Sequence, residues 1–202
     1  MEIQQPPRLT WISGTAFDLF ISLYVLHHPD RFGLRASWAA GVRSRLPQAE
    51  REFLENAQSF LTAPLLWLCS IGEDRSALAA LRELATIPAG ERLAVLTRNI
   101  DASPEFLAVI RKIQEQGTYT TEDVQVVTQD LARRSISQRP PAILELCKAW
   151  SQAEAFGENY LKALNSYYSV FFEEEERRIQ PALAFGLAEA RSLAVELPLP
   201  EL

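Results

Sequence analysis

The sequence is poor in the side chains that most often bind metals or form disulfides. It has two histidines, His27 and His28, and two cysteines, Cys69 and Cys147, among 202 residues. Adjacent histidines diverge by about 100° on a helix, and no other Cys or His lies within five residues of them. Their plainer role is to cap the C-terminal end of a helix. Both cysteines lie in apolar helical stretches and are predicted to be core residues, so we expect no bound metal and no disulfide.

The sequence also lacks a long uncharged apolar stretch. A helix that spans a membrane needs about 18 or more consecutive apolar residues, and no such run occurs. Glu2 stands near the start, and no basic segment precedes an apolar run as it would in a secretory signal. We therefore expect no membrane span and a cytoplasmic location.

Basic residues are outnumbered by acidic ones. The chain has 20 Lys and Arg against 26 Asp and Glu, a net charge of −6. Affinity for nucleic acid rests largely on Lys and Arg that neutralise phosphates, so we expect no tight binding of duplex DNA by this chain itself. Residues 103–139 could imitate a helix-turn-helix. The second helix of that pair begins with Glu122 and Asp123, however, which would face phosphates unfavourably.

Motifs of catalysis are missing as well. The sequence has no Gly-rich phosphate loop, no Gly-x-Ser-x-Gly elbow and no paired Cys motif. The consecutive carboxylates Glu173–Glu176 spread around a helix, where a solvated face with ion pairs to Arg177 and Arg178 is the simplest interpretation. We predict a non-enzymatic protein with no catalytic residue and no cofactor.

What the sequence does contain is helical periodicity with helix-start signals throughout. Ser103 followed by Pro104 predicts a capped helix start, and Gly117 predicts its end. No alternating strand pattern is longer than a few residues, so the predicted fold is all-α, a multi-helix bundle of about eight to nine helices. The helices expected before the last quarter of the chain are 13–28, 37–45, 47–61, 64–71, 75–87, 88–98, 103–117 and 121–134. The expected caps of the first, second and fifth are Ser13 or Thr15, Ser37 and Asp74, and the almost wholly apolar fourth is expected to be buried on all sides.

The last quarter, residues 140–197, has an apolar stripe at steps of three and four and reads as one very long helix or two in series. Gly157 lies on the stripe and would let a neighbouring helix approach closely. Pro181 predicts a kink or break near Gln180. An unbroken helix here would be about 80 Å long, so it must break or leave the globule. The predicted domains are a loose lead-in over 1–12, a helical domain over 13–180 and a helical extension over 181–202.

Aromatic side chains gather on the predicted helices. At helical spacing such a stripe is typical of a core, but it could also line a pocket for an apolar small molecule between helices. Both interpretations stay open. The candidate pocket residues are Trp67, Trp150, Tyr160, Tyr167, Tyr168 and Phe171.

The apolar stripe is interrupted by a glutamate, Glu175 or Glu176, and then resumes for several turns. Apolar residues in this late part need a partner, and a symmetric homodimer is the commonest solution. The alternative is that Pro181 turns the chain back, so that the same side chains complete the core of their own protomer. The candidate dimer-interface residues are Ile179, Leu183, Leu187 and Leu193.

Three parts of the sequence resemble the helical N-terminal regions of a group of bacterial winged-helix transcription regulators related to the ArsR family. They are residues 15–23 with His28 and Pro29, residues 37–47, and residues 168–181 with the run Phe171–Pro181. The resemblance implies an all-helical region followed by a C-terminal winged helix. Residues up to 202 contain no basic recognition helix, so contact with DNA would be made through a domain absent from this chain.

The resemblance favours a non-enzymatic regulatory region that dimerises or senses an effector. The metal-sensing cysteines of ArsR repressors have no counterpart in Cys69 or Cys147. Two other functions fit the composition: a stand-alone helical protein that binds an apolar small molecule, and a helical scaffold for protein interactions.

Overall fold

The computed structural model describes residues 12–98 and 101–196, so nearly all of the predicted lead-in and the last residues of the predicted extension lie outside the described residues. The described ranges contain helices and no strand, which confirms the all-α prediction. The elements are, in order, α1 (Thr15–His27), η1 (Pro29–Phe32), α2 (Ala36–Arg43), α3 (Gln48–Ala57), α4 (Leu65–Ser70), α5 (Ala77–Thr86), α6 (Ala89–Leu96), α7 (Pro104–Gln116), α8 (Thr121–Arg133), α9 (Pro140–Ser151), α10 (Ala153–Tyr167), η2 (Tyr168–Phe172) and α11 (Glu173–Glu196).

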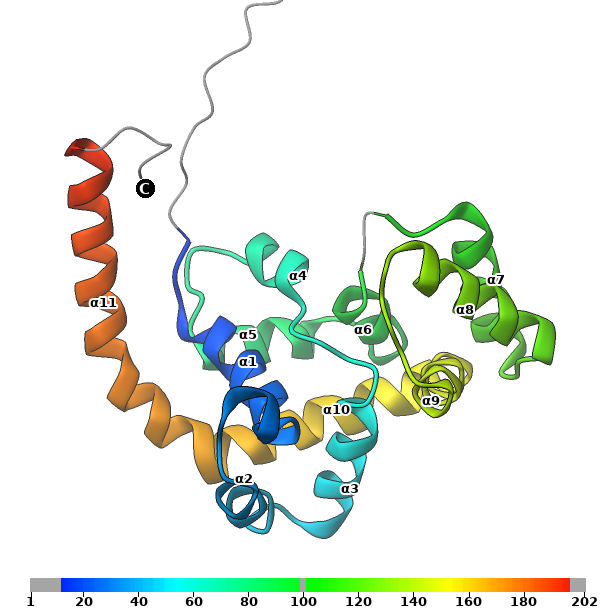
Figure 1. Ribbon diagram of the computed structural model, residues 1–202, viewed down its shortest axis with the longest axis horizontal. Helices are drawn as coiled ribbons and strands as arrows, with labels where there is room; N and C mark the ends of the chain where they lie inside the picture. The colour runs from blue at the N-terminus through cyan, green and yellow to red at the C-terminus, as the bar shows by residue number, and fades with distance from the viewer. Residues whose placement is uncertain (1–11, 99–100, 197–202) are drawn as a thin grey trace, which may run out of the picture.

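Helix α10 organises the body of the molecule. It crosses the middle of Figure 1 and packs against α3, α5, α6 and α9. Helices α1, α2, α4 and α5 lie toward its left, α3 lies below its middle, and α7–α9 gather at its right end (Figure 1). Tyr160, Leu164 and Tyr167 of α10 are fully buried. Burial of such side chains contributes about 1.5–3 kcal/mol each, so the stripe of α10 is a main source of stability.

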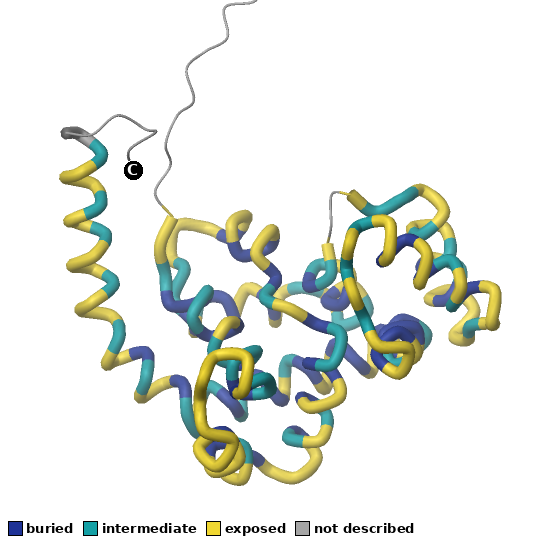
Figure 2. Tube along the Cα trace, in the orientation of Figure 1, coloured by how far each residue is buried: buried dark blue, intermediate teal, exposed yellow. Residues whose placement is uncertain are grey.

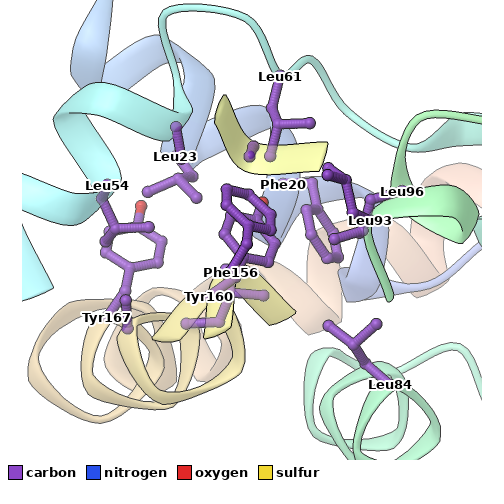
Figure 3. Packing of buried hydrophobic residues seen from close by; sticks show 14 of the residues in the cluster. Phe20, Leu23, Leu54, Leu61, Leu84, Leu93, Leu96, Phe156, Tyr160 and Tyr167 are labelled. Atoms are coloured by element: carbon purple, nitrogen blue, oxygen red, sulfur yellow. The ribbon is translucent and has the colours of Figure 1, made fainter. Parts of the chain in front are cut away.

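The core that surrounds α10 is built from several segments distant in sequence. Figure 3 shows Phe156 and Tyr160 of α10 among leucines from α3, α5 and α6. Phe156 stacks on Tyr160 with ring centroids 5.6 Å apart. The aromatic stripe therefore packs as a core along most of α10.

Gly157 lets α6 approach α10 closely, as the sequence predicted. A Cβ atom at Gly157 would lie 2.0 Å from the carbonyl oxygen of Ala89, at the start of α6. The buried guanidinium of Arg92 fixes the same contact, because its Nη1 donates to the Gly157 carbonyl at 3.0 Å and its Nε donates to the carbonyls of Leu84 and Ile87. Arg92 thus joins α5, α6 and α10 through backbone carbonyls.

Several helix starts follow the sequence signals. The Ser103 hydroxyl accepts a hydrogen bond from the Phe106 amide, and Gly117 ends α7 with φ of 66°. At the start of α8, Thr120 and Asp123 form a capping box. These signals are local, because the two caps each join residues three apart and the end of α7 depends on the single residue Gly117.

Other local predictions were wrong. Ser37 does not cap α2, because it already lies inside that helix. Ser76, not Asp74, caps α5, and Asp74 instead accepts a hydrogen bond from the Ser76 amide. Helix α4 was expected to be buried all round, but Leu65 and Leu66 are 53% and 43% exposed.

The C-terminal run breaks once near its start, at Gln152, and then continues beyond the body. Gln152 separates α9 from α10, which gives ten helical units in the described ranges when α10 and α11 are counted together. The π turn η2 joins α10 to α11. Helix α11 contains Pro181 and is not interrupted there. Figure 1 shows the run bending as it leaves the body, and Figure 2 shows exposed and half-buried positions along the outer part of α11. The run therefore both breaks and leaves the globule.

Candidate functional site

The carboxylate of Glu176 anchors the base of α11 to the body. The side chain is buried, unlike those of Glu173 and Glu174. Its Oε1 accepts hydrogen bonds from the Thr15 hydroxyl and, at 3.1 Å, from the Ala77 amide. Thr15 begins α1 and Ala77 begins α5, so one carboxylate connects three helices.

The second oxygen of Glu176 contacts the π turn. The Tyr168 hydroxyl donates to Oε2 at 2.8 Å. Burial and the neighbouring Glu176 charge raise the pKa of Tyr168 to about 12, because both disfavour the phenolate. Glu176 is the glutamate that interrupts the apolar stripe, and its partners explain how the carboxylate is accommodated there.

The other glutamates at the base of α11 form a solvated face, as expected. Arg177 pairs with Glu173 at 2.9 Å, and Arg178 pairs with Glu175. Both pairs lie within α11 and are exposed, so each contributes about 0–1 kcal/mol.

The candidate interface residues lie along α11 and divide into two groups. Ile179 is half-buried and packs against the protomer core. Leu183 and Leu187 are half-buried and Leu193 is 46% exposed, and none of the three joins the described core. Ile179, which precedes Pro181, therefore packs on its own protomer, and α11 does not turn back at Pro181 to bring the other three to the core.

Around these leucines, the outer part of α11 exposes further apolar surface. Phe185 is 69% exposed. Among residues 181–194, two of fourteen carry a charge, Glu189 and Arg191. A helix on the surface of a soluble protein normally has a charged or polar face opposite its apolar stripe. This segment has the composition of a buried helix.

Most of the candidate pocket residues are core residues in the structure. Trp67, Tyr160 and Tyr167 are buried in the main core, and the Tyr167 hydroxyl lies 2.9 Å from the Ser22 hydroxyl. Burial raises the pKa of Tyr167, with the Ser22 hydrogen bond acting against it. Tyr168 contacts Glu176, as described above.

Phe171 packs edge-to-face on Trp38 of α2, with ring centroids 6.2 Å apart. Both rings line a shallow depression that also includes Arg45, Glu174 and Glu175. The aromatic pair thus joins α2 to the π turn at the base of α11.

Trp150 is the one aromatic candidate that lines an apolar groove with a volume of about 360 Å³. Its walls come from residues 60–66, the end of α6, the helices α7 and α8, the segment before α9 and one face of α9 along its length. Ile143, Leu146 and Trp150 lie on that face of α9, and Leu65 and Leu66 of α4 also line the groove. The indole nitrogen of Trp150 is buried and has no hydrogen-bond partner among the described residues.

The charged side chains that line this groove are both arginines, Arg98 and Arg134. Arg134 Nε lies 2.7 Å from Asp130, and its guanidinium stacks 5.1 Å from the Phe106 ring centroid. Arg133 also contacts Asp130, at 2.9 Å. Although burial acts in the opposite direction, hydrogen bonds from Arg133 and Ser103 and the charge of Arg134 hold the pKa of Asp130 below its usual value.

The remaining candidates take structural positions. Cys147 is buried and its pKa is raised to about 11 by desolvation and then by Asp123, but Cys69 is exposed, so the prediction of a core position was wrong for Cys69. The Nδ1 atoms of His27 and His28 contact carbonyls of the last turn of α1, as predicted. Asp123 is buried and pairs with Lys112 at 2.9 Å.

Metal-binding clusters and membrane-spanning helices are both absent from the described ranges. No three His, Cys, Asp or Glu side chains lie together there in an arrangement that could hold a metal ion. No helix in residues 12–98 or 101–196 has the length and apolar character needed to cross a bilayer.

Sequence reasoning missed the partners of Glu176 and the arginines of the groove. Thr15 was read as a possible helix cap, and nothing near it signals a contact with a glutamate 161 positions later. Arg98 was expected at the end of the helix over 88–98, and no spacing in the sequence relates it to Arg134. Long-range contacts of this kind leave no local pattern.

Comparisons with known proteins add no relative. No protein-family model, no curated protein and no solved structure matches this chain.

Proposed function

We propose that this chain is a non-enzymatic dimerising region of an ArsR-like bacterial transcription regulator, in which the outer part of α11 joins two copies. The observation that carries the proposal is the exposed apolar surface of residues 181–194. Contact between this segment and water is unfavourable, because each exposed apolar group loses the free energy that its burial would provide.

A second copy of the chain is the partner that this surface fits best. The segment carries one acidic residue, Glu189, and one basic residue, Arg191, so it is electrically neutral. Two such helices can pack without like-charge repulsion, and a two-fold arrangement closes the contact on itself. A dimer also suits a regulator, since many DNA-binding proteins read two half-sites with two-fold symmetry.

Light scattering of the purified chain tests the proposal. We expect the wild type to have the mass of a dimer and the double variant Leu183→Glu, Leu187→Glu to have the mass of a monomer with unchanged helical circular dichroism. The matched control is Leu78→Glu with Leu144→Glu, two exposed leucines on α5 and α9 that should leave the dimer intact. A monomeric wild type, or a double variant that unfolds, contradicts the proposal.

The link to transcription regulation has a separate test, because it rests on the resemblance. The reading frame that follows the codon for Leu202 is expected to encode a basic winged helix. A stop codon at that point would remove the regulator from the proposal and leave the dimerising helix as an independent question.

A further inference from the structure

The apolar groove beside Trp150 combines two properties that point to a ligand class. We propose that it binds an amphipathic organic anion, with an aliphatic or aromatic tail against α9 and a carboxylate near Arg98 and Arg134. The proposal goes beyond dimerisation through α11 and does not depend on it.

The apolar walls account for the tail. Phe60, Leu146 and Trp150 line the groove with apolar side chains, and Leu65 and Leu66, which line it too, are about half exposed. Its volume of about 360 Å³ falls in the range of known small-molecule sites, about 300–1,000 Å³. An apolar tail placed here would cover side chains that now face water.

The charges account for the head group. The chain has a net charge of −6, yet both charged side chains that line this groove are arginines. The single carboxylate of Asp130 is shared between Arg133 and Arg134, so this trio keeps one net positive charge. Arg98 adds a second positive charge beside the same groove.

Three other depressions on the described surface lack this combination, and one of them, between α8 and the start of α9, is lined by no charged side chain. The groove between α3 and the α9–α10 junction is lined by one acid and one base, Glu145 and Lys148. The depression at Trp38 has two glutamates against one arginine. Charge therefore distinguishes the groove beside Trp150 as the one that would attract an anion and exclude a cation.

Titration calorimetry with matched probes tests the ligand class. Decanoate, decanol and decyltrimethylammonium share one tail and differ in the charge of the head group, and 2-naphthoate replaces the aliphatic tail with an aromatic one. We expect decanoate or naphthoate to bind about tenfold more tightly than decanol, and the cation to bind most weakly. The stronger of the two anions identifies the tail. Equal affinity for the three ten-carbon probes, or no binding of either anion, overturns the proposal.

Matched variants test the location. Leu66→Asp places a negative charge at the groove, and Leu107→Asp does the same on an exposed leucine of α7 that does not line it. Arg98→Ala removes a charge that lines the groove. Arg111→Ala removes an exposed charge on α7, outside the groove. We expect Leu66→Asp and Arg98→Ala to weaken anion binding about tenfold and both controls to leave it unchanged.

The same four variants separate ligand binding from protein contact. If Leu66→Asp, but not Leu107→Asp, lowers the molar mass in light scattering, the groove is an interface between copies and the ligand proposal fails. If Leu66→Asp does not fold, Arg98→Ala decides alone, because Arg98 is exposed at the end of α6. Unchanged anion preference in Arg98→Ala overturns the proposal.

Discussion

The inner and outer parts of the C-terminal helical run have the same apolar period but opposite surroundings. In the inner part, Tyr160, Leu164 and Tyr167 are fully buried. In the outer part, Leu183 and Leu187 lie at comparable helical spacing, but no described element of the protomer covers them. Periodicity therefore predicts that a helix has an apolar face, but it does not identify the segment that covers that face.

The polar faces of the two parts differ as well. The inner part exposes Glu154, Glu158 and Lys162 on the side away from the core. Most of the exposed residues of the outer part are small or apolar, including three alanines and Phe185, and its charged residues are Glu189 and Arg191. The inner part is an ordinary amphipathic helix whose burial is complete within one protomer. The outer part has no comparable polar face, which is the reason we assign it a partner.

The largest expected effect separates the leucines of the two parts. Leu164→Ala should lower the free energy of unfolding by about 3 kcal/mol, because it leaves a cavity in a fully packed core. Leu187→Ala should change it by about 0.5 kcal/mol or less at protein concentrations where the chain is monomeric. Urea unfolding followed by circular dichroism measures both. Equal losses would mean that α11 is packed against its own protomer.

Replacement of each of the two glycines in this run by alanine should change the stability of the chain in opposite directions. Gly157→Ala should lower the free energy of unfolding by about 2 kcal/mol, because the added Cβ would overlap the backbone of Ala89. Nothing lies within 4 Å of a Cβ placed on Gly186, so Gly186→Ala should stabilise the chain by up to about 1 kcal/mol through helix propensity. Thermal unfolding of the two variants side by side gives the signs. A stabilised Gly157→Ala would show that α6 does not approach α10 so closely.

The glutamates at the junction of the two parts form the third pair. Glu176→Gln should cost about 1.5 kcal/mol, because the neutral amide weakens the hydrogen bonds from Thr15, Ala77 and Tyr168. Glu174 is exposed, and Glu174→Gln should have an effect near zero. Urea midpoints at neutral pH compare them. Similar midpoints for both variants would show that Glu176 does not anchor α11.

The smallest expected effect concerns Tyr168, which is half-exposed and partly screened by water. Its pKa is about 12 in the folded chain and about 10 when unfolded. Because the folded pKa is above the unfolded value, the protonated Tyr168 hydroxyl stabilises the folded chain. This stabilisation is complete below pH 10 and is lost as pH rises from 10 toward 12. Tyr168→Phe should therefore show a shallower decline of unfolding free energy between pH 9 and pH 11 than the wild type. An identical decline would contradict the contact with Glu176.

Much of the fold could be predicted because its signals are local. The Ser103 cap, the Gly117 end and the close approach at Gly157 each depend on a residue type at one position in a periodic pattern. Predictions failed where a tertiary contact competes with a local rule. Ser37 has a capping side chain but lies one residue inside α2, and Cys69 lies in an apolar stretch on a short helix with an exposed side.

The candidate sites were less predictable than the fold. The stripe on α11 was visible because its leucines follow one helical period within a single segment. The groove was not, since its walls come from residues 60–66, α6, α8 and α9, and no spacing in the sequence relates Leu66 to Trp150. Whether an aromatic side chain belongs to a core or to a groove depends on neighbours that only the folded chain brings together.

The π turn at Tyr168–Phe172 has a consequence for the direction in which the outer helix faces. A π turn holds more residues per turn than an α-helix, and each residue of an α-helix advances the chain by about 100° around its axis. The turn therefore sets how far α11 is rotated about its own axis relative to the body, and so which way each of its faces points. Removal of one residue from this turn would swing Leu183 and Leu187 by about a quarter of a revolution without altering their own helix. The orientation of the exposed stripe is thus encoded in five residues that lie outside it.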